Sequence, residues 1–143
     1  MIPLRDENPT RITPYFTWLL IAANIAIYGL QILSGMHEGR TGLIGGISGW
    51  TMVPVEVTQG IDVSTNGRTL LQPFWLTIFT SMFMHGGLLH LGGNMLFLLI
   101  FGNNIEDALG HTKYIAFYLA CGVLAAFAQI ASNPDSVIPT LGA

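Results

Sequence analysis

The sequence has very little charge. Only 9% of its 143 residues are charged, whereas soluble domains carry about a quarter. The charged residues also leave three long stretches empty, at residues 12–37, 69–105 and 114–134. Each stretch is long enough to contain a helix of about 20 apolar residues, the length that crosses a bilayer. A soluble protein with a buried helical core is disfavoured, because too little polar surface would remain to face water.

Basic clusters and cysteine pairs are missing as well. The net charge is −3 and the sequence has no basic run, so nothing supports nucleic-acid binding. The single cysteine, Cys121, cannot form an internal disulfide. Its apolar surroundings indicate a small packing residue.

We therefore expect an all-α membrane protein, a polytopic helical bundle with spans at about residues 14–33, 87–103 and 114–130. The first apolar region is longer than the 7–15 residues of a signal peptide, so it is predicted to be a retained span. The middle uncharged stretch is too long for one straight helix, and Gly86-Gly87 offers a natural break within it. A polar turn at 103–113 is predicted to separate the last two spans.

The basic residues near the N-terminus predict how the chain is oriented in the membrane. Residues 1–13 form a polar lead that carries Arg5 and Arg11, and the positive-inside rule favours a cytoplasmic N-terminus. The loop at 34–73 is then extracytoplasmic, and its apolar residues suggest that part of it lies in the membrane interface. Asn24 is the one amide in the middle of the first span, where we expect it to bond to another helix.

Strongly polar side chains inside a membrane are costly and mark functional sites. The uncharged middle stretch contains His85, His90 and Asn94. His90 and Asn94 are four residues apart, so on a helix they share one face. Two N–H donors on one face suit an oxyanion hole, which stabilises negative charge in a transition state. Inter-helix hydrogen bonds explain the same spacing equally well.

His85 is predicted to be a structural group at the glycine break, because helical geometry would point it about 140° away from His90. A metal site is disfavoured, since the spacing does not match the His-Glu-x-x-His pair of zinc proteases and no carboxylate or cysteine stands nearby. We expect no metal and no cofactor.

These residues resemble a known family. The pattern His85-x₄-His90-x₃-Asn94 looks like the motif in the second span of rhomboid intramembrane serine proteases. Residues 101–110 are similar to the turn that follows in that family, and residues 2–10 and 139–143 are similar to bacterial members. The resemblance covers nearly the whole chain in order.

The resemblance implies a bundle of six spans that cleaves transmembrane helices with a Ser–His dyad, in the bacterial inner membrane. It implies that His90 and Asn94 stabilise the oxyanion, that His85 supports them, and that Glu106 is structural. The loop at 34–73 resembles the family's lateral first loop. On this basis residues 14–143 form a partial rhomboid domain, whose partners are the lipid bilayer and transmembrane protein substrates.

The sequence also departs from the family pattern. Gly142-Ala143 resembles the first half of the family's Gly-x-Ser-Gly motif, and the serine, the basic histidine and three spans are not among residues 1–143. We therefore expect this polypeptide to be inactive by itself. Two alternatives are a catalytically inactive rhomboid-like protein that binds client helices, and a transporter fragment. The transporter predicts internal repeats, and none is visible.

Overall fold

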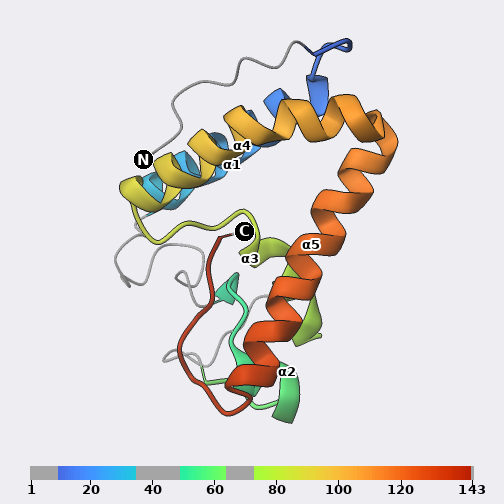
Figure 1. The fold of residues 1–143 in the computed structure, drawn as a ribbon. Helices are drawn as coiled ribbons and strands as arrows, with labels where there is room; N and C mark the ends of the chain where they lie inside the picture. The colour runs from blue at the N-terminus through green and yellow to red at the C-terminus, as the bar shows by residue number, and fades with distance from the viewer. Residues whose placement is uncertain (1–9, 35–48, 64–72, 143) are drawn as a thin grey trace.

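The computed structural model describes residues 10–34, 49–63 and 73–142, and these are helical apart from their connections and a single isolated bridge between Met52 and Thr140 (Figure 1). The predicted lead at 1–13 and loop at 34–73 therefore lie largely outside the described residues. The elements in chain order are α1 (Tyr15–Leu33), α2 (Pro54–Gln59), η3 (Phe74–Leu76), α3 (Thr77–Ser81), α4 (Leu88–Leu109) and α5 (His111–Ser132).

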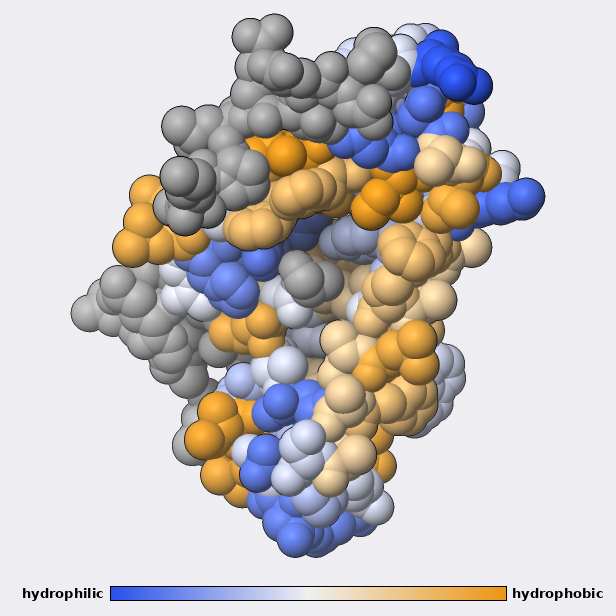
Figure 2. Space-filling model, viewed as in Figure 1, coloured by the Kyte–Doolittle hydropathy of each residue, from blue (hydrophilic) through white to orange (hydrophobic). Residues whose placement is uncertain are grey.

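Three of these helices, α1, α4 and α5, are long and apolar enough to cross a membrane. Figure 2 shows apolar side chains along the length of α5, while polar residues gather at its two ends. Large apolar side chains such as Leu89 and Leu124 are exposed. This distribution is the one expected of helices whose outer surface faces lipid. The chain is thus an all-α membrane protein.

The predicted polar turn at 103–113 is wrong. Helix α4 continues to Leu109, and only Gly110, with a φ of +76°, separates it from α5. The polar residues do not break the helix because their side chains have partners. Asn104 donates its amide to the carbonyl of Ile100 one turn earlier. Glu106 accepts from Thr17 in the first turn of α1, and Asp107 accepts from Ile12 just before α1 begins.

The long helices form an angled frame. Helices α1 and α4 pack side by side in opposite directions, and α5 turns away from them after Gly110 (Figure 1). The short helices α2 and α3 pack against the far part of α5. A small core of Met52, Ile78 and Ala126 joins these three helices. The frame therefore leaves a space between the α1–α4 pair and α5.

Glu106 joins the three long helices at the end of the frame where α1 begins and α4 is followed by α5. Its buried carboxylate accepts hydrogen bonds from the backbone N–H groups of Phe16 and Thr17, at 3.0 and 2.8 Å, and from the Thr17 hydroxyl at 2.7 Å. The first N–H groups of a helix have no partner within the helix and carry partial positive charge. The carboxylate of α4 therefore caps α1, which has no side-chain cap of its own.

The start of α5 joins the same cluster. His111 places Nδ1 2.6 Å from the Glu106 carboxylate, and the Tyr114 hydroxyl lies 3.2 Å from the Thr17 hydroxyl. One carboxylate thus connects all three long helices. Its structural role agrees with the one that the family resemblance implies.

We predict that Glu106→Ala lowers the free energy of unfolding by about 3 kcal/mol, because two backbone N–H groups and a buried hydroxyl lose their acceptor. Titration with a denaturing detergent in mixed micelles measures the change. Asp107→Ala is the matched control. Asp107 accepts from the N–H groups of Arg11 and Ile12 at a more exposed position, where water replaces it, so its loss should cost about 1 kcal/mol. Equal losses in the two variants would contradict the assigned role.

Candidate functional site

The candidate site begins where α4 starts. The chain between α3 and α4 is not helical from Phe83 to Gly87 apart from a turn, and α4 begins at Leu88, directly after the predicted glycine break. His85 lies in this connection and is only 1% exposed. Its Nδ1 lies 3.2 Å from the carbonyl oxygen of Phe83. Because a carbonyl can only accept, Nδ1 carries the proton, and the His85 ring donates to the backbone of the connection in which it lies.

Burial also fixes the charge of His85. Burial lowers the pKa of its imidazole below the usual 6.5, the bond to the Phe83 carbonyl opposes this, and His90 adds a smaller lowering. The ring is therefore neutral at pH 7. With the proton on Nδ1, its Nε2 is an acceptor.

The backbone of His85 is held from α1. The side chain of Gln31, which is fully buried, accepts from the His85 N–H and donates to the His85 carbonyl, both at 3.1 Å. Gln31 is not among the functional residues predicted from the sequence. The sequence could have indicated it, because an amide in an apolar span is unusual and Gln31 is a second such amide beside Asn24.

His90 and Asn94 lie on the first two turns of α4, as their spacing predicts. The rings of His85 and His90 pack edge to face, with centroids 5.3 Å apart and an interplanar angle of 63°. The amide nitrogen of Asn94 is buried and has no hydrogen-bond partner among the described residues. In an apolar setting, such a free donor interacts strongly with any negative charge placed beside it.

The segment after α5 returns to these side chains. A β-carbon added at Gly142 would lie 2.8 Å from Cε1 of His90 and 3.1 Å from Nδ2 of Asn94. Gly142 also has a φ of +76°. A glycine is needed here for both reasons, the close approach and the left-handed backbone. The structure thus brings Gly142 and the two predicted donors together.

Backbone hydrogen bonds hold this returning segment. The N–H of Gly142 donates to the carbonyl of Ser81 at 2.9 Å, and that of Thr140 donates to the carbonyl of Met52 at 2.8 Å. Near α2, the Gln59 amide donates to the Asp135 carboxylate at 2.7 Å. Residues from the long loop and from α3 therefore determine where Gly142 lies.

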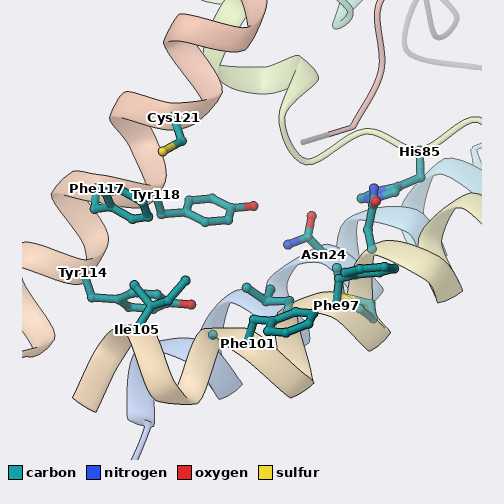
Figure 3. A pocket seen from close by; sticks show the side chains of 13 residues that line it. Asn24, His85, Phe97, Phe101, Ile105, Tyr114, Phe117, Tyr118 and Cys121 are labelled. Carbon is teal, nitrogen blue, oxygen red and sulfur yellow. The ribbon is translucent and has the colours of Figure 1, made fainter. Parts of the chain in front are cut away.

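A cavity of about 260 Å³ opens beside the site, between α4 and α5 (Figure 3). Its walls are mainly apolar, but His85 and Asn94, which line it, each have a buried polar side-chain atom without a partner among the described residues. The amide nitrogen of Asn24 donates to the carbonyl of Leu20 within α1. The bond expected to another helix therefore does not come from this nitrogen. Figure 3 shows the Asn24 side chain pointing toward Tyr118 of α5. Whatever fills this cavity must offer hydrogen-bonding groups.

We predict that Gly142→Ala lowers the free energy of unfolding by roughly 2 kcal/mol, since a left-handed alanine is strained and its β-carbon meets His90. Detergent titration again measures the change. Gly93→Ala on α4 is the matched control, because an added β-carbon there meets nothing within 4 Å. Removing a glycine from a helix should stabilise it by up to about 1 kcal/mol. The same sign of change in both variants would contradict the close packing of Gly142.

The low pKa of His85 predicts a pH dependence of stability. The unfolded chain takes up a proton as the pH falls below 6.5, while the folded imidazole stays neutral to a lower pH. The stabilising contribution of His85 is complete above pH 6.5 and declines as the pH falls toward the folded pKa. A ¹⁵N NMR titration of the histidines should show His85 neutral at pH 7 with the proton on Nδ1. A His85 midpoint at or above 6.5 would refute the prediction.

Comparisons with known proteins agree with these features. The Rhomboid domain family matches residues 72–143, which contain α3, α4, α5 and the returning segment. The chain is also 27% identical over 130 residues to rhomboid protease GluP of Bacillus subtilis (strain 168), covering 91% of this chain. It spans only 22% of the length of that relative. No solved structure matches. With the family's match running from α3 through His85, His90 and Asn94 to the returning segment, the chain belongs to the rhomboid family.

Proposed function

We propose that this chain is part of an intramembrane serine endopeptidase that cleaves transmembrane helices. In this proposal His90 and Asn94 stabilise the oxyanion, and His85 supports them. The attacking serine and the basic histidine come from residues outside 1–143, so these residues alone do not hydrolyse peptides. The protein lies in the bacterial inner membrane with its N-terminus in the cytoplasm.

The free donor of Asn94 carries the proposal. A buried amide nitrogen without a partner is costly in a folded protein, and such strained polar groups occur where function requires them. Asn94 lies one turn from His90, and both contact the space beside Gly142. An oxyanion in that space would meet two N–H donors in apolar surroundings, where their effect is large.

The position of Gly142 adds support. If Gly142-Ala143 begins the Gly-x-Ser-Gly motif of the family, the serine follows two residues after a glycine that touches both donors. An oxyanion hole must lie close to the nucleophile, because the oxyanion forms on the carbonyl carbon that the nucleophile attacks. The backbone bonds to Ser81 and Met52 hold Gly142 beside His90 and Asn94.

An inactive rhomboid-like protein that binds client helices is the alternative. The cavity between α4 and α5 favours it, because apolar walls with unpaired polar atoms on His85 and Asn94 suit a helix that presents polar groups. Binding of this kind needs no nucleophile. A proteolysis assay separates the two proposals.

We predict that Asn94→Ala, in the full-length protein that contains these residues, lowers kcat for a transmembrane substrate about 10-fold or more with little change in KM. The donor acts on charge that exists only in the transition state, so substrate binding should hardly change. Cleavage of a fluorescent substrate in liposomes measures both constants.

Asn133→Ala is the control, because Asn133 is exposed beyond the end of α5. It should leave both constants unchanged. An unaltered kcat for a well-folded Asn94→Ala protein would refute the oxyanion role. A full-length protein that binds transmembrane helices but never cleaves them would favour the alternative.

A further inference from the structure

Gln31 is a polar residue in a buried position of an apolar helix. It lies in the last turn of α1, at the end of an apolar span, and is 0% exposed. Both polar atoms of its side chain are used, and both bond to the backbone of one residue, His85. A carboxamide is the neutral side chain that can donate and accept at adjacent atoms in this way.

The neighbouring backbone shows why this pair of bonds matters. On one side of His85, the N–H of Met84 bonds back to the carbonyl of Ser81. On the other side, the carbonyl of Gly87 accepts from Leu91 in the first turn of α4. The N–H and carbonyl of His85 lie between these two anchors, outside any helix. The amide of Gln31 satisfies both groups, which would otherwise be buried without partners.

The His85 backbone in turn determines where the two histidine rings meet. The His85 ring has its Nδ1 fixed on the Phe83 carbonyl and packs against the His90 ring with centroids 5.3 Å apart. A shift of the His85 backbone would therefore move the surface on which the His90 imidazole rests. Displacements of about 1 Å are enough to weaken catalysis strongly.

We propose that Gln31 is a positioning residue for the oxyanion donors. Through its two bonds to the His85 backbone it fixes the His85 ring, and through that ring the imidazole of His90. This inference rests on the proposed function of His90. It connects α1, which carries no residue of the proposed oxyanion site, to the chemistry of α4.

Two substitutions separate positioning from simple helix packing. Gln31→Leu keeps approximately the size of the side chain but replaces the polar amide with an apolar group and removes both bonds. Gln31→Glu keeps the acceptor for the His85 N–H, and it regains the donor only when the new carboxyl is protonated. A carboxylate would face the His85 carbonyl with like partial charge, so low pH restores the pair and high pH breaks it. Burial raises the pKa of such a carboxyl toward the neutral range.

The first experiment uses this 143-residue chain in bicelles and needs no activity. Amide hydrogen exchange at His85 should be about 10-fold faster in Gln31→Leu, because one hydrogen bond to a buried N–H is lost. The ¹⁵N resonances of the His90 ring should shift in the same variant. Gln129→Leu is the control, since Gln129 is an exposed amide on α5, and it should change neither signal. Unchanged exchange at His85, or an unshifted His90 ring, would overturn the proposal.

The second experiment measures cleavage by the full-length protein. Gln31→Leu should lower kcat about 10-fold with KM nearly unchanged. Gln31→Glu should approach wild-type kcat at pH 5 to 6 and lose activity as the pH rises, when each rate is taken relative to wild type at the same pH. A kcat unaffected in both variants, in a protein where Asn94→Ala is impaired, would overturn positioning.

The two proposals fail in distinguishable ways. If the wild-type protein cleaves nothing, the proposed function fails, and exchange at His85 together with the His90 resonances still decides whether Gln31 sets the histidine pair. If the wild type cleaves and Gln31→Glu follows the pH profile of wild type, helix packing explains Gln31 and the inference is wrong.

Discussion

The buried carboxylate of Glu106 is the interaction on which the rest of the structure depends. The first backbone N–H groups of a helix have no partner within the helix, and where protein buries them no water reaches them, so another part of the protein must satisfy them. Here one side chain of α4 accepts from the start of α1 and meets His111 at the start of α5. At the opposite end of α1, Gln31 bonds to the chain that leads into α4. The α1–α4 pair is thus joined at both ends by polar side chains, with apolar packing between them.

Much of this could be predicted from the sequence because polarity inside an apolar stretch is informative. The charge-free stretches located α1, α4 and α5, and the four-residue spacing placed His90 and Asn94 on one face of a helix. The same reasoning failed at the end of α4. It treated the polar run after Asn103 as a turn, although those side chains have partners within the helix and on α1. A polar residue marks the end of a span only when nothing in the protein bonds to it.

Other features depend on contacts between distant segments, which no local pattern reveals. Neither the two bonds from Gln31 to His85 nor the approach of Gly142 to His90 follows from periodicity. The family resemblance associated Gly142 with the Gly-x-Ser-Gly motif, but only the fold shows that its backbone lies against His90 and Asn94. Asn24 illustrates the converse case. The sequence predicted a bond to another helix, and the Asn24 side chain does point toward Tyr118 of α5, but the bond of its amide nitrogen to the Leu20 carbonyl within α1 was not predicted.

The single residue between α4 and α5 has a mechanical consequence. Only Gly110 connects the two helices. A change in the tilt of α5 relative to α4 must therefore change the backbone torsions at that residue and the contacts around it. Helix tilt responds to the thickness of the surrounding hydrocarbon layer. Because α4 and α5 form opposite walls of the cavity, any change in the angle between the two helices would change the width of the cavity.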